Sequence, residues 1–164
     1  MLKTYKFRLY LTNEQIEKLN QHFGHTRFVY NLFLEFSSNA YKNTKTSTNY
    51  YMWAKVLTAL KKTEKYQWLN DANSQSLQQS IKNLETGFKR FFKKQAKHPK
   101  FKKKSSRQSF RVPQHIQLYE NEGNDKYGTL FVPKFKEGIK VRVHRKIDPN
   151  AKIKNCTFIK TTTG

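Results

Sequence analysis

The chain is short of cysteine and has no long apolar run. Cys156 is the only cysteine among its 164 residues, which excludes an internal disulfide and a cysteine-rich zinc cluster. No segment approaches the roughly 18 consecutive apolar residues that a membrane-spanning helix requires. The opening segment MLKTYKFRLY also lacks the apolar centre of a secretory signal peptide. These absences predict a soluble protein of a reducing compartment.

Acidic residues are also few, because only 11 residues are Asp or Glu and they are scattered along the chain. Hydrolytic chemistry needs paired acids, a metal cage or a nucleophile beside a base, and the sequence shows none of these patterns. The acids within residues 120–125 indicate a hairpin loop, since their spacing does not fit a calcium loop. His144 has no ligand set around it, and His22 and His25 are expected at the surface or at the core edge. We therefore expect no catalytic residue, no metal site and no cofactor.

Positive charge dominates the composition. The chain has 33 Lys and Arg residues and a formal net charge of +22, an excess that destabilises a compact fold unless a polyanion binds. Nucleic acid is the first candidate partner, and an anionic membrane is the second. Half of the excess lies between residues 86 and 119, where no acid occurs. The basic residues of this stretch are Lys89, Arg90, Lys93, Lys94, Lys97, Lys100, Lys102, Lys103, Lys104, Arg107 and Arg111.

This basic stretch predicts a groove that follows a phosphate backbone, because Lys and Arg neutralise phosphates and release counterions. Phe101 and Phe110 within it would add stacking on bases. The alternative interpretation is a solvated run of charge that serves only solubility.

Four helices are predicted from apolar periodicity and capping residues. Thr12 and Gln15 fit a capping box, and Gly24 is placed to end the first helix in a left-handed cap. With a second helix behind it, the span 13–42 resembles a helix-turn-helix, although any helical hairpin gives that pattern. The remaining helices are expected over residues 26–42, over 50–62, and from Asn73 or Ser74 to about Gln95.

The other segments alternate as strands do. Residues 1–11 have apolar positions interleaved with basic ones, which is typical of a half-buried strand with a cationic outer face. Later strands are expected around residues 110–112, 129–132, 139–145 and 153–161. The first strand cannot pair within the helices, so it should complete the later sheet. The predicted fold class is α+β, with a helical lobe (12–96) inserted into a strand domain (1–11 and 110–164) and followed by an exposed basic linker (97–109).

Five segments in this order resemble a known family: MLKTYKFRLYLTNEQ, FGHTRFVYNLFLE, LQQSIKNLETGFKRFFKK, HPKFKKKSSRQSFRVP and VPKFKEGIKVRVHRKI. They are similar to the N-terminal half of the insertion-sequence OrfB (TnpB) proteins, across essentially the whole chain. The resemblance implies an RNA-guided DNA endonuclease family in which a small β-barrel wedge domain holds an inserted recognition lobe of helices. It also implies RNA and DNA as partners, no membrane contact, and a cytoplasmic, nucleoid-associated protein.

In that family the RuvC-like nuclease and the zinc ribbon would follow residue 164, so the resemblance assigns no catalytic residue here and the chain is not expected to be an enzyme alone. A separate nuclease chain is an open alternative, as is a helix-turn-helix regulator or a transposition accessory protein. The resemblance also implies that residues outside the basic stretch contact nucleic acid. These are Lys3, Lys6, Arg8, Arg27, Asn31, Lys140, Arg142 and Arg145.

Overall fold

The protein has a mixed α+β fold, which confirms the predicted class. The computed structural model describes residues 1–161. Its elements in chain order are β1 (Arg8–Tyr10), α1 (Asn13–Thr44), α2 (Tyr50–Leu60), the 3-10 helix η1 (Gln67–Asp71), α3 (Ser74–Phe92), β2 (Gln108–Val112), β3 (Gln117–Asn121), β4 (Asn124–Val132), β5 (Phe135–Arg142) and β6 (Cys156–Lys160).

The first two predicted helices are one continuous helix, so the predicted break at Gly24 is wrong. The Thr12 capping box is present, because the Gln15 amide N–H donates to the Thr12 hydroxyl at 3.2 Å and the Gln15 side chain accepts from the Thr12 N–H at 3.1 Å. The helix then runs to Thr44 and ends at Lys45 in the left-handed region, with a φ of 55°. A mid-helix glycine costs only about 1 kcal/mol, and burial of the apolar stripe on both sides outweighs that cost.

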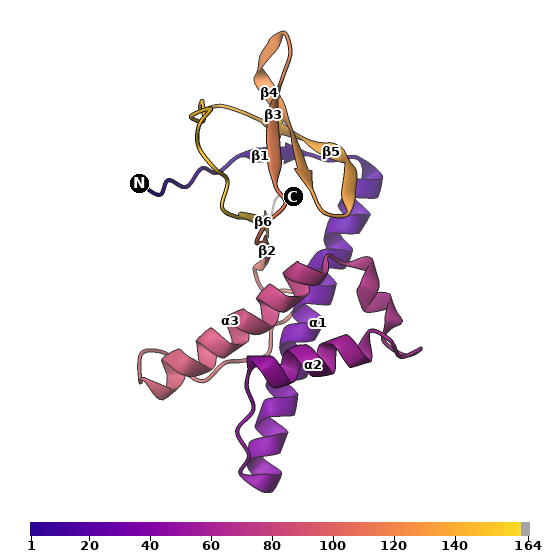
Figure 1. Cartoon of the computed structure of the whole chain (residues 1–164), viewed down its shortest axis with the longest axis vertical. Coiled ribbons are helices and arrows are strands. Elements are labelled where there is room, and N and C mark those ends of the chain that lie inside the picture. The colour runs from indigo at the N-terminus through magenta and orange to yellow at the C-terminus, as the bar shows by residue number, and fades with distance from the viewer. Residues whose placement is uncertain (162–164) are drawn as a thin grey trace.

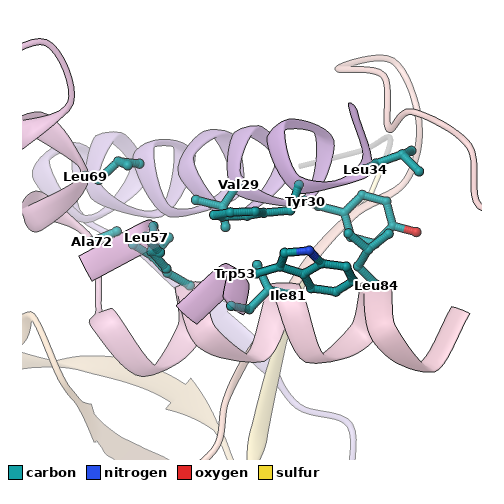
Figure 2. Packing of buried hydrophobic residues seen from close by; sticks show 11 residues of the cluster. Val29, Tyr30, Leu34, Trp53, Leu57, Leu69, Ala72, Ile81 and Leu84 are labelled. Carbon is teal, nitrogen blue, oxygen red and sulfur yellow. The ribbon is translucent and has the colours of Figure 1, made fainter. Parts of the chain in front are cut away.

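The helical half of the molecule has its own hydrophobic core. Val29 and Phe33 of α1, Trp53 of α2 and Ile81 of α3 are 0–1% exposed. Figure 2 shows the Trp53 indole lying between the α1 and α3 side chains. The indole N–H donates to the Thr48 hydroxyl at 2.9 Å, so the one polar group of this buried ring is satisfied.

Two antiparallel sheets make up the other half. The larger sheet has the strand order β1-β5-β4-β3, and the smaller one pairs β2 with β6. β1 pairs with β5 through Leu9 and Val141, which confirms that the first strand joins the later strands. Among the described residues neither sheet closes into a barrel. β3 was not predicted, and the first strand covers three residues rather than eleven.

α1 connects the two halves (Figure 1). Its N-terminal part contributes Leu19 and Phe23 to a second core, which Phe110, Ile139 and Phe158 of the sheets complete. Its C-terminal part packs against α2 and α3. The strands therefore gather around one end of α1 and the other helices around its remainder.

His22 lies inside the molecule and not at its edge, contrary to expectation. Its side chain is 1% exposed. Nδ1 lies 2.7 Å from the Lys18 carbonyl and Nε2 accepts from the Asn73 backbone N–H at 3.1 Å, which requires the proton on Nδ1. Burial lowers the pKa of His22 below its ordinary value. The histidine thus links α1 to the start of α3 in its neutral form.

Candidate nucleic-acid interface

The basic stretch is held against the helices and is not a free linker. The Asn31 amide donates to the Lys102 carbonyl at 2.9 Å and accepts from the Lys102 N–H at 2.8 Å. Pro99 packs on Gly87, where an added Cβ would meet the proline ring at 3.3 Å. His98 contacts the Phe88 ring with centroids 5.4 Å apart. These contacts fix the backbone that carries the lysines, so the charges are arranged in space before any ligand binds.

The Lys102 side chain turns back over α1. Its ammonium lies 4.2 Å from the centre of the Tyr30 ring, within the range of a cation–π contact. Desolvation beside this ring lowers the pKa of Lys102 from its ordinary value. Burial raises the pKa of the Tyr30 hydroxyl, so the ring stays neutral. Tyr30 therefore has a structural contact, in keeping with its place in the helical core.

A cleft opens where α1, α3, the basic stretch and β2 meet. It is small, with room of about 40 Å³ for water-sized molecules, and it is partly open to solvent. Five cations line it, together with hydroxyl and amide side chains, and no carboxylate does so among the side chains that the structure describes. The cations are Arg27 of α1, Lys102, Lys103 and Arg107 of the basic stretch, and Arg111 of β2.

Hydrogen bonds fix the walls of this basic cleft. The Arg27 guanidinium donates to the Gln108 side chain at 2.8 Å, and the Gln108 amide donates to the Lys104 carbonyl at 3.1 Å. The Ser80 hydroxyl donates to the Thr26 carbonyl at 2.7 Å, which ties α3 to α1. Arg27 accordingly retains further N–H donors that can reach an anion. A cleft with preset donors and uncompensated positive charge suits phosphate oxygens.

The structure brings only some of the predicted residues to this cleft. The cleft is lined by Arg27, Lys102, Lys103 and Arg107. The Asn31 side-chain amide instead forms hydrogen bonds with the backbone of the basic stretch. The remaining predicted residues are exposed and lie elsewhere. At or beyond the C-terminal end of α3 are Lys89, Arg90, Lys93, Lys94 and Lys97, and the cleft residues are flanked in sequence by Lys100 and Lys104. The segment before β1 carries Lys3 and Lys6. The larger sheet carries Arg8, Lys140 and Arg142, and Arg145 follows β5.

Sequence reasoning missed the polar residues that α3 contributes to the cleft. Ser76, Ser80 and Asn83 of α3 line it beside the cations. Their steps of four and three place them on one side of the helix, next to the apolar stripe. A polar stripe beside the apolar stripe of α3 is the sequence signal that could have predicted this side of the cleft.

The described residues offer no metal centre. No group of three or more His, Cys, Asp or Glu residues is placed to hold a metal ion, as far as the side chains are described. His144, which had no expected ligand set, makes an edge contact with the Phe7 ring. No helix in the same part of the chain is long and apolar enough to span a membrane.

Comparison with known proteins relates this basic α+β chain to proteins of insertion sequences. The family model of the OrfB helix-turn-helix domain matches residues 1–46. A putative RNA-guided DNA endonuclease of Streptomyces pristinaespiralis is 31% identical over 163 residues, which are 99% of this chain and 39% of that protein. The putative RNA-guided DNA endonuclease InsQ of Escherichia coli (strain K12) is 34% identical over 133 residues, or 81% of this chain and 32% of InsQ.

A shorter relative matches nearly end to end. The virulence protein VsdF of Salmonella dublin is 36% identical over 113 residues, which are 63% of this chain and 95% of VsdF. The chain belongs to the OrfB (TnpB) family of insertion-sequence proteins and corresponds to its N-terminal part. It spans about two fifths and one third of the two endonuclease relatives. In this family member the matched helix-turn-helix segment contains one uninterrupted helix, α1.

Proposed function

We propose that this chain is the nucleic-acid-binding part of a TnpB-like RNA-guided DNA endonuclease, where it binds guide RNA and target DNA. The sheets take the place of the wedge domain, and α1, α2 and α3 form the recognition lobe. Within this chain no residue is assigned to cutting, and cleavage is expected to depend on carboxylates supplied from elsewhere. Association with the nucleoid follows from the same binding.

The basic cleft is the observation that supports this proposal most directly. Its cations come from two segments that are far apart in sequence, α1 and residues 102–111, and hydrogen bonds hold these segments together without a ligand. A solvated run of charge would leave its lysines on a free backbone. A clustered site of one charge sign, with backbone and side-chain donors around it, instead matches the phosphate contacts that position a nucleic acid.

Purification without nuclease treatment tests the proposal. We expect RNA to copurify, and its sequence to be enriched in transcripts of a neighbouring insertion-sequence end. Random ribosomal RNA in its place would indicate a general basic protein, and the absence of any bound RNA or DNA in low salt would contradict nucleic-acid binding altogether. DNA cleavage by the purified chain with magnesium alone would overturn the assignment of cutting to other residues.

A DNA-binding regulator or transposition accessory protein is the second candidate, because the matched family model describes a helix-turn-helix domain. Such a protein reads duplex DNA through a recognition helix. A defined footprint on duplex DNA, together with weaker binding to RNA of the same length, would favour it over the guide-binding function.

A further inference from the structure

The larger sheet has a solvent-facing side that carries both tyrosines and cations. Strand pairing defines this side, since Leu9, Leu130 and Val141 point into the core and their neighbours point outward. We call it the tyrosine face. It comprises Arg8, Tyr10, Tyr119, Tyr127, Thr129, Phe131, Lys140 and Arg142.

Four of these residues form one row straight across the sheet. Tyr10 pairs with Lys140, Lys140 with Thr129, and Thr129 with Tyr119. The row therefore has an aromatic ring at each end and a cation and a hydroxyl between them. Neighbouring strands are about 4.8 Å apart, so the backbones of Tyr10 and Tyr119 lie roughly 14 Å from one another. Both rings are accessible, with Tyr10 36% and Tyr119 54% exposed.

The cations of the face are held beside the rings. The Lys140 ammonium lies 4.4 Å from the centre of the Tyr127 ring and 6.0 Å from that of Tyr10. The Tyr10 and Tyr127 rings meet edge to face at 5.8 Å, and the Arg8 guanidinium lies 5.9 Å from the Tyr10 ring. Tyr127 thus orients Lys140 at the middle of the row. No carboxylate occupies a paired position of this face among the side chains that the structure describes.

Tyr119 has a second aromatic ring beside it on this face. Its ring contacts Phe131 edge to face at 5.9 Å. Gly138 has a φ of 76°, and a Cβ there would collide with the Thr129 methyl and meet the Phe131 ring at 3.0 Å. Glycine at this position therefore leaves room for the Thr129 and Phe131 side chains, which lie on the same side of the sheet as Tyr119.

We infer that the tyrosine face binds a short run of unpaired nucleotides, with bases stacked on Tyr10 and Tyr119 and the intervening phosphate on Lys140. This inference rests on the proposed nucleic-acid-binding function and adds a second site to the basic cleft. Unpaired bases offer their faces to aromatic rings, whereas the bases of a duplex already stack on one another. Arg8 and Arg142, in the next row, extend the positive surface along the backbone.

Binding of the full chain to three fluorescent probes tests the inference: oligouridine, oligodeoxythymidine and a blunt DNA duplex of matched length. Replacing both rings (Tyr10→Ala with Tyr119→Ala) should weaken binding of the unpaired probes by roughly 5- to 150-fold for each ring that stacks. The matched pair Tyr10→Phe with Tyr119→Phe keeps the rings and should retain the affinity. Duplex binding should be unchanged in both. A preference for either unpaired probe distinguishes RNA from DNA as the natural source.

Equal affinity of the alanine pair and the wild type for the unpaired probes would overturn the inference, as would an equal loss of duplex binding. The Arg107→Ala variant separates the two sites. If it weakens binding while the alanine pair does not, only the tyrosine face is wrong; if the wild type binds no probe, the proposed function falls as well.

Photo-crosslinking of the wild type keeps the test independent of variant folding. Oligouridine that contains 4-thiouridine should form adducts in the peptides that carry Tyr10 or Tyr119, and adducts confined to other peptides would contradict the inference.

Discussion

The basic cleft makes a quantitative prediction about salt. If all five cations contact phosphates of a single-stranded RNA, the slope of log K against log salt is about −0.7 for each contact, or about −3.5 in total. Affinity should then fall about 130-fold between 50 and 200 mM salt. The Arg107→Ala variant retains four of the contacts, so its slope should be about −2.8 and its loss over the same range about 50-fold.

The control for this measurement removes the same charge from another place. Lys55 is exposed on α2, away from the cleft residues, so Lys55→Ala should keep the slope of the wild type. Fluorescence anisotropy with a labelled oligouridine at four or more salt concentrations gives all three slopes. Equal slopes for Arg107→Ala and Lys55→Ala would refute the reasoning, because the net charge and not the cleft would then set the affinity.

Three further predictions concern stability and order. Asn31→Ala should speed amide hydrogen exchange around Lys102 and cost about 0.5–1.5 kcal/mol, because the exposed Lys102 N–H exchanges its protein partner for water; unchanged exchange there would show that the contact does not hold the basic stretch. Trp53→Ala should lower the free energy of unfolding in urea by about 3–5 kcal/mol, since it empties the centre of the helical core, whereas a loss below about 1 kcal/mol would place the ring outside that core. Burial lowers the pKa of both His22 and His25 in the folded state. Their contribution to the free energy of unfolding is therefore present above the unfolded-state pKa of about 6.5 and is lost as the pH falls through the folded-state pKa. The urea midpoint should fall between pH 7.5 and pH 5.5, and a constant midpoint would contradict this.

Local signals in the sequence predicted several details well. Thr12 and Gln15 form the expected capping box, and Asn73 caps α3 through its side chain. The alternation of Val141 with basic neighbours identified β5 and its cationic side. These signals act within a few residues, so they are legible in the sequence without knowledge of tertiary contacts.

The sequence-based predictions were wrong where tertiary packing determines the local structure. Gly24 was expected to end a helix, but the buried residues on both sides of it keep α1 continuous. β3 was missed because Leu118 alone of its residues packs against the core, so its alternation is weak. The contact between Asn31 and Lys102 spans 71 residues, and no local pattern shows which chain segment an asparagine will hold. The basic stretch is exposed as expected, but its attachment to α1 through Asn31 was not predicted.

The predicted nucleic-acid contacts divide in the same way. Charge density alone identified Lys102, Lys103 and Arg107, which line the cleft, and the family resemblance added Arg27. Neither signal grouped these residues with Ser80 of α3, because their meeting depends on how α1 and α3 pack. Contact of any of them with RNA or DNA stays a prediction.

The unbroken α1 has a consequence for protein engineering. At 1.5 Å per residue its 32 residues extend for roughly 48 Å, and both hydrophobic cores take side chains from it. Removing the helical lobe from residue 12 onward would also remove Leu19 and Phe23, and the apolar side of the strands would then be exposed to solvent. Chimaeras between relatives should instead be joined within α1, between Phe23 and Val29, where the helix passes from one core to the other.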